Sequence, residues 1–451
     1  MISGTQFRMR GDAPALLDDA TDRWLDYRGL AHAVTKAAER LRRRPLVFVF
    51  SGLSIPGAVA YLGCLEAGAP VALFGDSLPA GRAEALITLY RPTWVVGFTP
   101  AASYAEVPGQ PGWYRRQTDD APALHPDLAL LLSTSGSTGS PKLVRLSRQA
   151  IDSNAAAIVE SLAITPDQRS VLNLPFSYSY GLSVLNSHLA AGASIVLTRE
   201  GLTGEGFWRR IAAQQVTSMP GVPMVYEMLR RLGFDNVAPA SLTTLTQAGG
   251  KLSVPLIQHF SEIMAARGGR FFVMYGATEA APRMAVLQAP ERPGAVGRAI
   301  PGGRFEIEAG EIIYHGPNVM LGYAERADDL VLGDQLNGRL ATGDLGHLDE
   351  DGVLWITGRA KRIAKVNGLR LNLDEVEALA TARFAPAAVI AGDERLTLLI
   401  EADETRATEI RRDMAAALAL PPASVRVQCV ARLPLSANGK IDRDAVGRLV
   451  A

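Results

Sequence analysis

The chain has 451 residues, more than one compact core usually holds, so two or more domains are expected. Apolar residues make up 48% and aromatic residues 6%, which is typical of a globular protein and not of a disordered or fibrous one. Basic and acidic residues number 46 each, and this balance offers no electrostatic basis for binding nucleic acid or an anionic membrane.

The cysteines and histidines exclude two further classes. Cys64 and Cys429 both lie in apolar stretches, which predicts a reducing compartment and no disulfide framework. The six histidines show no spacing typical of a transition-metal site. The sequence contains no basic segment followed by an apolar core at its start, and no apolar run long enough to span a bilayer. We therefore expect a cytoplasmic protein without a membrane partner.

Short strand-like runs alternate with helical patterns through the first three quarters of the chain. Residues 45–52 are typical of a buried strand, residues 56–69 of a helix, and residues 70–74 of the next strand. More strand-like runs follow, at residues 93–98, 129–136, 170–176, 193–200, 216–221, 242–250 and 270–276. This alternation predicts an α/β fold whose sheets are covered by helices on both faces.

The pattern changes after Gly294. Residues 304–316 and 349–359 combine short strands with glycine turns, which indicates hairpins. The chain then becomes strongly charged, and a small α+β unit follows, with a helix beginning near Leu373. The sequence predicts a large domain over residues 1–358, a hinge at 359–362 and a small domain over 363–451.

The segment STSGSTGSPK, residues 133–142, follows a predicted buried strand and has the features of an anion-binding loop. Gly136 and Gly139 allow backbone N–H groups to approach phosphate oxygens, hydroxyl side chains add donors, and Lys142 adds positive charge. It is not a Walker A loop, because Leu143 stands where that motif requires a hydroxyl. A flexible surface loop is the alternative interpretation.

This segment closely resembles the signature loop of the adenylate-forming superfamily, which includes acyl- and aryl-CoA synthetases, nonribosomal peptide adenylation domains and luciferases. Other segments resemble the remaining family motifs in their expected order, at residues 25–30, 61–73, 174–185, 247–252, 274–279, 341–346, 358–377 and 433–443. The resemblance implies a large N-terminal domain of α/β layers with a distorted β-barrel-like region, and a small mobile α+β C-terminal domain. The chain looks most similar to free-standing acyl-CoA or acyl-carrier-protein ligases.

The resemblance implies ATP and Mg²⁺ as cofactors. The loop would hold the triphosphate during attack on the α-phosphorus, through Thr134, Ser135, Gly136, Ser137, Thr138, Gly139 and Lys142. Glu279, with Thr138, would bind Mg²⁺, since a hard cation takes oxygen ligands. Thr278 would contact the α-phosphate. The adenine would lie against Tyr275, Gly276, Gly249 and Gly250.

The remaining implied roles lie towards the end of the chain. Asp344 would accept hydrogen bonds from the ribose hydroxyls, with Arg359 beside it. Lys440 would enter the site with the small domain and balance charge on the carboxylate and α-phosphate. Lys361 is the implied hinge residue, so gating by domain rotation is expected. The loop that replaces Lys440 in the thiol step would contain Lys365, Gly368 and Arg370.

The pocket segment bears on the acid that is activated. Tyr178, Ser179, Val222 and Gly249 resemble acid-pocket positions. Amino-acid-activating relatives place an aspartate after the pocket aromatic, and Ser179 at this position cannot neutralise a buried ammonium. We therefore expect a fatty, short-chain or aryl acid without an α-amino group. Tyr178 and Tyr180 are alternatively plain packing residues, and a carboxylate from elsewhere could serve an amino acid.

The sequence thus predicts an ATP-dependent acid–thiol ligase. It would form acyl-AMP and pyrophosphate, then a thioester with CoA or with the phosphopantetheine of a separate carrier protein. The alternatives are a free-standing amino-acid adenylating enzyme that loads a carrier protein, and a catalytically inactive nucleotide-binding homologue. Further alternatives are a P-loop ATPase and an adenylating enzyme that passes the acyl group to an amine or oxidises it.

Overall fold

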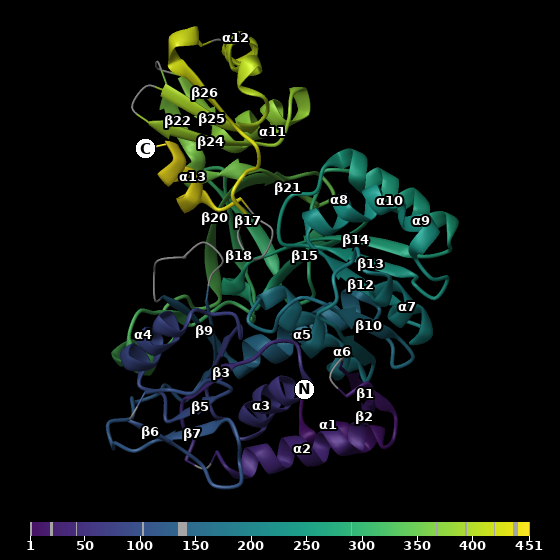
Figure 1. Ribbon diagram of the computed structural model, residues 1–451, viewed down its shortest axis with the longest axis vertical. Coiled ribbons are helices and arrows are strands. Elements are labelled where there is room, and N and C mark those ends of the chain that lie inside the picture. Colours follow the sequence, from purple (N-terminus) through teal and green to yellow (C-terminus); the bar gives the residue numbers. More distant parts are fainter. Residues whose placement is uncertain are drawn as a thin grey trace. The chain divides into compact units, whose positions relative to one another are not determined.

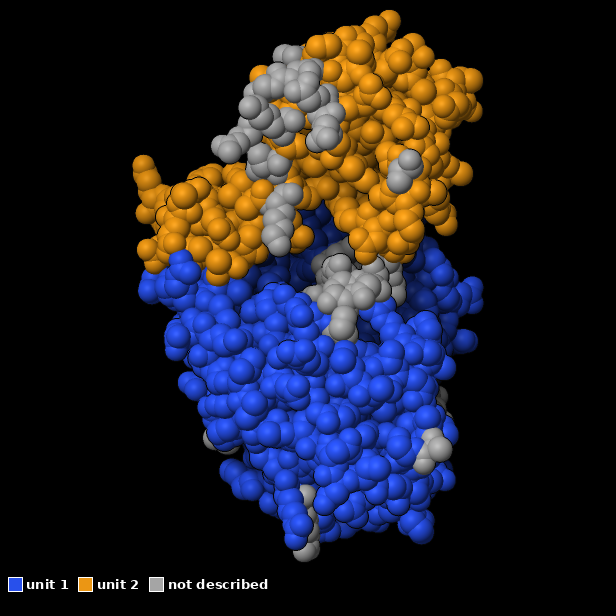
Figure 2. Space-filling model, turned by 90° about the vertical axis from the view of Figure 1, so that its left-hand side faces the viewer, with its two compact units in different colours: residues 1–305, 314–340 blue, residues 306–313, 341–451 orange. Residues whose placement is uncertain are grey.

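Two large sheets organise most of the chain in the computed structural model (Figure 1). The structure describes residues 2–18, 21–41, 43–101, 103–133, 142–289, 291–366, 369–392, 395–418, 420–435 and 441–450. The chain divides into two compact units: unit 1 comprises residues 1–305 and 314–340, and unit 2 comprises residues 306–313 and 341–451 (Figure 2). The predicted boundary and hinge at residues 359–362 stay predictions.

The first sheet of unit 1 has nine strands. Their order is β16 (Arg298–Ala299), β15 (Arg283–Ala289), β14 (Arg270–Gly276), β13 (Thr244–Gln247), β12 (Ser218–Gly221), β10 (Arg169–Leu172), β11 (Ser194–Leu197), β1 (Pro14–Leu17) and β2 (Trp24–Asp26). The strands from β14 to β1 pair in parallel, whereas β15, β16 and β2 pair antiparallel at the two edges. A parallel centre requires helical crossovers, as the alternating sequence pattern predicted.

The second sheet of unit 1 has eight strands. Their order is β19 (Gly322–Ala324), β9 (Leu143–Ser147), β8 (Leu128–Ser133), β4 (Val71–Phe74), β3 (Val47–Phe50), β5 (Trp94–Val96), β7 (Trp113–Arg116) and β6 (Tyr104–Glu106). Strands β8, β4, β3 and β5 pair in parallel, and they are fully or almost fully apolar. The antiparallel pair β8–β9 flanks residues 134–141.

Helices accompany both sheets of unit 1. They are α1 (Gly4–Arg10), α2 (Tyr27–Glu39), α3 (Ile55–Glu66), α4 (Ala80–Tyr90), α5 (Arg148–Leu162), α6 (Ser179–Ala191), α7 (Glu205–Ala213), α8 (Pro223–Leu232), α9 (Phe234–Val237) and α10 (Val254–Ala266), with 3₁₀ turns η1 (Thr278–Ala280) and η2 (Ala327–Val331). Several begin at a side-chain cap, such as Ser54 before α3 and Ser147 before α5. No helix within the described residues is long and apolar enough to cross a membrane.

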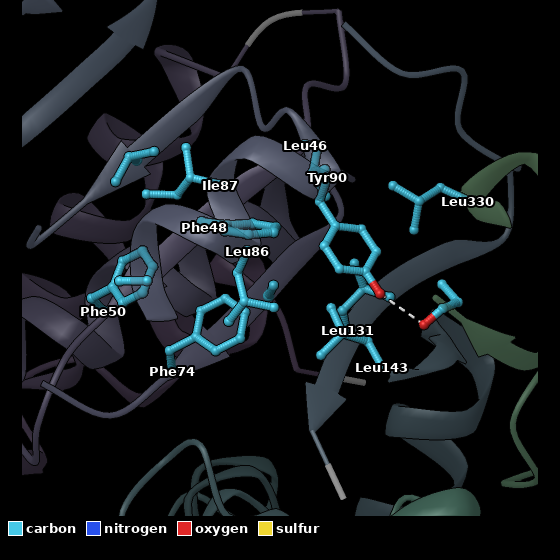
Figure 3. Packing of buried hydrophobic residues seen from close by; sticks show 14 of the residues in the cluster. Leu46, Phe48, Phe50, Phe74, Leu86, Ile87, Tyr90, Leu131, Leu143 and Leu330 are labelled. Carbon is cyan, nitrogen blue, oxygen red and sulfur yellow. Dashed lines mark hydrogen bonds between the residues drawn. The ribbon is translucent and has the colours of Figure 1, made fainter. Parts of the chain in front are cut away.

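An aromatic core holds α4 against the eight-stranded sheet (Figure 3). The rings of Phe48 and Phe74 lie 5.1 Å apart, and Phe50 stacks on Phe74 at 5.0 Å. At the edge of this core the Tyr90 hydroxyl donates to the Ala324 carbonyl oxygen over 2.7 Å, as Figure 3 shows. This bond satisfies a buried tyrosine hydroxyl and fixes the end of β19.

Unit 2 contains most of a four-stranded sheet and a small α+β body. The first sheet has the order β17 (Arg304–Glu308), β18 (Glu311–His315), β20 (Arg339–Leu348) and β21 (Leu354–Arg359). It forms no closed barrel among the described residues. The second body has β22 (Ile363–Val366), β23 (Leu369–Asn372), β24 (Ala387–Gly392), β25 (Arg395–Glu401) and β26 (Val425–Val430), with α11 (Leu373–Arg383), η3 (Ala360–Arg362), η4 (Glu404–Arg406), α12 (Ala407–Ala417), η5 (Pro422–Ser424) and α13 (Arg443–Val450).

We predict that His188 on α6 makes the protein sensitive to mild acid. Burial lowers the pKa of His188 from 6.5 to about 4, and Nδ1 donates to the Val184 carbonyl oxygen over 2.9 Å. Because the folded pKa lies below the unfolded value, its contribution to stability is complete above pH 6.5 and is lost as the pH falls towards 4. The expected loss is about 3 kcal/mol of the free energy of unfolding.

Urea unfolding between pH 7 and 4 measures this loss. His188→Gln should lose less stability than the wild type over this range, by about the same 3 kcal/mol. His32→Gln, which changes an exposed histidine on α2, should follow the wild-type curve. Parallel curves for His188→Gln and the wild type would contradict the prediction.

Candidate functional site

The site begins where neighbouring parallel strands end. Strands β10, β12, β13 and β14 lie side by side in the nine-stranded sheet (Figure 1), and their carboxyl ends meet at one edge. The predicted pocket residues Tyr178, Val222 and Gly249, and the predicted α-phosphate contact Thr278, lie in the segments that follow these strands. In open α/β sheets, ligands bind outside the carboxyl ends of the strands. Because these segments all leave the sheet at the same edge, the strand order brings the four positions close together.

The predicted pocket residues lie in contact. Tyr178 precedes α6, and Gly249 follows β13 with a φ of +85°, a conformation that glycine adopts without strain. A Cβ atom at Gly249 would lie 2.3 Å from the Tyr178 hydroxyl and 3.2 Å from Cγ1 of Val222. The neighbouring Gly250 lies under Pro223, where a Cβ would come within 3.1 Å of the ring. Glycine is thus required at position 249 for close approach of these side chains.

Ser179 joins the pocket segment to the predicted phosphate contact. Its hydroxyl lies 3.1 Å from the hydroxyl of Thr278, and Ser179 is buried. Gly276 permits the turn between β14 and η1, because a Cβ there would lie 2.1 Å from the carbonyl oxygen of Pro282. The ring of Tyr275 is 9% exposed and packs at 6.4 Å from that of Phe305. Little of the Tyr275 ring is therefore available to an adenine in this structure.

Glu279 and Lys142 meet on one tyrosine. The hydroxyl of Tyr323 donates to Oε1 of Glu279 over 2.9 Å, and Nζ of Lys142 lies 3.5 Å from the centroid of the same ring. Burial and the Glu279 carboxylate both raise the pKa of Tyr323, so its hydroxyl stays protonated and keeps donating. The ring face attracts the ammonium. One side chain thus holds the predicted metal ligand and the lysine that ends the phosphate loop.

Arg145 fixes the strand that carries Tyr323. The strand β19 pairs antiparallel with β9, which places Tyr323 opposite Val144. The fully buried Arg145 side chain donates to five acceptors: the carbonyl oxygens of Leu321, Tyr323, Leu332 and Gly333, and Oε1 of Gln335. Burial of a guanidinium is costly unless its donors are satisfied in this way. Arg145 is therefore a structural residue that positions Tyr323.

In unit 2, Asp344 and Arg359 form an ion pair. They lie opposite each other in the antiparallel pair β20–β21, and Nε of Arg359 is 3.0 Å from Oδ1 of Asp344. The backbone before Asp344 is held by two bonds: Gly343 N–H donates to Glu311, and Thr342 donates to the Ile312 carbonyl oxygen. The register thus places the predicted ribose pair together.

Several predicted residues lie outside the described residues: Thr134, Ser135, Gly136, Ser137, Thr138, Gly139, Gly368 and Lys440. For Lys361, Lys365 and Arg370 only the backbone is described; Lys361 lies in η3, and Lys365 pairs with Arg370 between β22 and β23. The roles predicted for all of these residues stay predictions.

Described residues on both sides of Lys440 are anchored. Leu435 pairs with Ile441, and Asp442 N–H donates to the Pro434 carbonyl oxygen over 2.9 Å. Arg443 donates to both carboxylate oxygens of the buried Glu377, which also accepts from the Val389 N–H over 2.7 Å. These bonds set where the chain enters and leaves residues 436–440.

Sequence reasoning missed three residues of this site. Tyr323 lies 178 residues after Arg145 and 44 after Glu279, so no local pattern could connect them. Arg283 is also buried within the site, with its guanidinium carbon 5.0 Å from the centroid of the Tyr180 ring. For Arg283, the sequence did offer one signal: an arginine that begins an apolar strand-like run, PRMAVL at residues 282–287.

Comparison with known proteins agrees with this architecture. The family described as AMP-binding enzyme matches residues 5–324. Indoleacetate–CoA ligase of Aromatoleum aromaticum is 29% identical over 359 residues, covering 73% of this chain and 69% of that protein. The L-proline–[L-prolyl-carrier protein] ligase of Streptomyces coelicolor is 30% identical over 360 residues, covering 72% of this chain and 67% of that protein. A much longer relative, the probable nonribosomal peptide synthetase CymA of Salinispora arenicola, is 30% identical over 423 residues, and the chain covers only 5% of it.

Solved structures share the fold. O-succinylbenzoate–CoA synthetase MenE from Bacillus subtilis, in complex with AMP, has a TM-score of 0.76 at 22% identity, with 97% of each chain covered. ATP-bound MatB from Rhodopseudomonas palustris has a TM-score of 0.78 at 23% identity, with 99% of each chain covered.

The chain belongs to the AMP-binding enzyme family, which matches well over half of it. The resemblance to adenylate-forming enzymes, the α/β fold class and the assignment to the AMP-forming acid–thiol ligases are therefore confirmed.

We predict that Tyr323→Phe lowers the rate of adenylate formation about tenfold. The phenyl ring keeps its contact with Lys142, but the Glu279 carboxylate loses the hydrogen bond that it accepts from the Tyr323 hydroxyl. Hydrogen bonds to a charged acceptor are stronger than neutral ones. Acid-dependent pyrophosphate exchange, measured across a Mg²⁺ titration, should show a higher Mg²⁺ requirement. Tyr114→Phe is the control. Tyr114 lies on β7, near the other edge of the eight-stranded sheet, and its hydroxyl bonds only to Thr99 among the described residues. An unchanged rate and Mg²⁺ requirement in Tyr323→Phe would contradict the prediction.

Proposed function

We propose that this protein is an ATP-dependent ligase that joins a carboxylic acid lacking an α-amino group to a thiol, through an acyl adenylate. The observation that supports this most directly is the Tyr323 bridge between Glu279 and Lys142. It holds the carboxylate that we predict to bind Mg²⁺ beside Lys142, the cation that ends the glycine- and hydroxyl-rich segment. Family membership and the Asp344–Arg359 pair agree with it.

In the first half-reaction, a carboxylate oxygen of the acid attacks the α-phosphorus of ATP. The bond from that phosphorus to the bridging oxygen of the β-phosphate breaks, and pyrophosphate leaves. The chain would contribute positioning and positive charge, with Lys142 and residues 134–141 acting on the phosphates, Thr278 on the α-phosphate and Lys440 on the charge of the attacking carboxylate. Asp344 and Arg359 would hold the ribose.

The residues fit a bound Mg²⁺. Glu279 is half-buried, and its Oε1 accepts only the Tyr323 bond among the described residues, so the carboxylate retains acceptor capacity. Mg²⁺ is commonly held by one or two carboxylates together with substrate phosphates. When bound, the cation would neutralise charge that develops on the phosphate oxygens. MenE of Bacillus subtilis has been solved with ATP and magnesium.

The second half-reaction transfers the acyl group. The thiol sulfur attacks the acyl carbon, the bond to the phosphate oxygen of AMP breaks, and the thiol proton is released. CoA and carrier-protein phosphopantetheine present the same thiol arm. Relatives include indoleacetate–CoA ligase and L-proline–[L-prolyl-carrier protein] ligase, so both acceptors occur among similar proteins.

The pocket favours an acid without an α-ammonium group. Ser179 is buried, and its hydroxyl forms a hydrogen bond with the hydroxyl of Thr278. A neutral hydroxyl cannot neutralise a buried ammonium. The nearby Arg283 guanidinium would repel one.

A carboxylic-acid panel tests the proposal. Pyrophosphate release should depend on a fatty, short-chain or aryl acid, and thioester should form when CoA or a phosphopantetheinylated carrier protein is added. The matched α-amino acids should be inactive or much slower. ADP formation in place of AMP, or a preference for an α-amino acid, would contradict the proposal.

We predict that Lys440→Ala separates the two half-reactions. It should lose most adenylate formation, about 100-fold or more, because its ammonium balances charge only in the first transition state. The variant should still convert synthetic acyl-AMP and a thiol into thioester. Arg432→Ala, in the same unit, is the control and should retain both steps. Equal loss of both steps in Lys440→Ala would contradict the alternating use of the small domain predicted over residues 363–451.

A further inference from the structure

Arg283 is held in place by its backbone, not by its side chain. It is the first residue of β15, and its side chain is almost fully buried. Its N–H donates to Oδ1 of Asn154 over 3.3 Å, and its carbonyl oxygen accepts from the amides of Asn154 and Asn318, each over 2.9 Å. The fold therefore fixes the position of the Arg283 backbone.

The guanidinium lacks polar partners. Its Nε is buried without a hydrogen bond, and no ion pair or side-chain hydrogen bond joins Arg283 to the described residues. The contact that remains is the Tyr180 ring, 5.0 Å away. Arg145 is also buried, but its guanidinium donates to five acceptors. A buried unsatisfied donor on a charged group is costly, so the two arginines serve different purposes.

The groups around Arg283 leave a net positive charge. Its charged and titratable neighbours are the hydroxyls of Tyr178 and Tyr180. Burial raises the pKa of Tyr180 to about 12 and also raises that of Tyr178, so both are neutral. Burial lowers the pKa of Arg283 itself, but an arginine remains protonated in proteins. Within the described part of the chain, this buried cation thus has no counter-anion.

The same short segment joins this cation to the predicted reaction centre. Ser179 contacts Thr278, where the α-phosphate is expected, and the next residue, Tyr180, contacts Arg283. Tyr178 in turn lies against Gly249 and Val222. A ligand that fills this pocket with its reacting carboxylate near Thr278 would have its remainder near Arg283.

We propose that Arg283 binds a second carboxylate of the substrate, so that the acid is a dicarboxylic acid of which one end is adenylated. This inference rests on the proposed function and narrows its substrate class. A carboxylate matches the planar fork of a guanidinium and would satisfy the donors that the protein leaves free. Arg283 is then a specificity-determining residue that touches the substrate away from the reacting atoms.

Matched substrates test the inference. Each diacid from succinate to suberate, and the isomers of phthalate, is compared with its own monomethyl ester in the pyrophosphate-release assay. The wild type should use the best diacid about 100-fold better than its ester, measured as kcat/KM, because the ester leaves the buried cation unpaired. Arg283→Met should lose this preference, and Arg283→Lys should retain part of it.

Control variants separate specificity from structure. Arg270→Met changes an arginine that also covers an aromatic ring, Phe272 at 5.3 Å, and should keep the diacid preference. Arg283→Met should melt at or above the wild-type temperature, because it replaces an unpaired buried charge by an apolar side chain. A lower melting temperature with equal loss on diacid and ester would instead assign Arg283 a structural role and overturn the inference, as would a wild type that prefers the ester.

Ligand-induced melting shifts distinguish this inference from the proposed function. If no acid releases pyrophosphate, the proposed function fails. In that case, a rise in melting temperature with a diacid but not its ester, abolished in Arg283→Met, would still support the binding role of Arg283. No rise with any diacid would contradict it.

Discussion

The site depends on one constraint: strand β19, residues 322–324, must be held beside the β8–β9 pair that flanks the predicted phosphate loop. Arg145 supplies the lock, because its guanidinium bonds to the carbonyl oxygens of Leu321 and Tyr323 and to the segment after them. Tyr90 adds a bond to Ala324 from the aromatic core. With the backbone fixed on both sides, the Tyr323 side chain can hold Glu279 and Lys142 together. Pre-organisation of this kind lets a phosphate site stabilise developing charge without first rearranging its own groups.

The nine-stranded sheet brings the predicted pocket residues together in a different way. Parallel strands β10, β12, β13 and β14 end at one edge, so each following segment contributes to one place. Close contacts then refine it, since Gly249 admits the Tyr178 hydroxyl and Ser179 reaches Thr278. Arg283 is buried beside the Tyr180 ring. In our proposals, reaction chemistry comes from the Tyr323 bridge and substrate choice from the Tyr178–Tyr180 segment with Arg283.

Much of this could be predicted from the sequence, for physical reasons that differ between elements. Strand β14 was predicted with the bounds that the structure has, because a short apolar run between glycine turns defines it locally. The roles of Asp344 and Arg359 were implied by the resemblance to the adenylate-forming enzymes, and the pairing of β20 with β21 places the two residues opposite each other. Tyr323, Arg145 and Arg283 were not predicted, because their roles arise from contacts between distant segments. An arginine is usually exposed, so nothing local indicated that two of them would be fully buried.

The most direct test of the central claim follows an oxygen atom. An acid accepted by the enzyme is labelled with ¹⁸O in its carboxylate, and the phosphate-containing products are analysed by mass spectrometry after thioester formation. We expect one labelled oxygen in AMP and none in pyrophosphate, because the carboxylate oxygen that attacks the α-phosphorus stays with AMP when the thiol displaces it. Label in inorganic phosphate with ADP as the product, or unlabelled AMP, would contradict adenylate formation at this site.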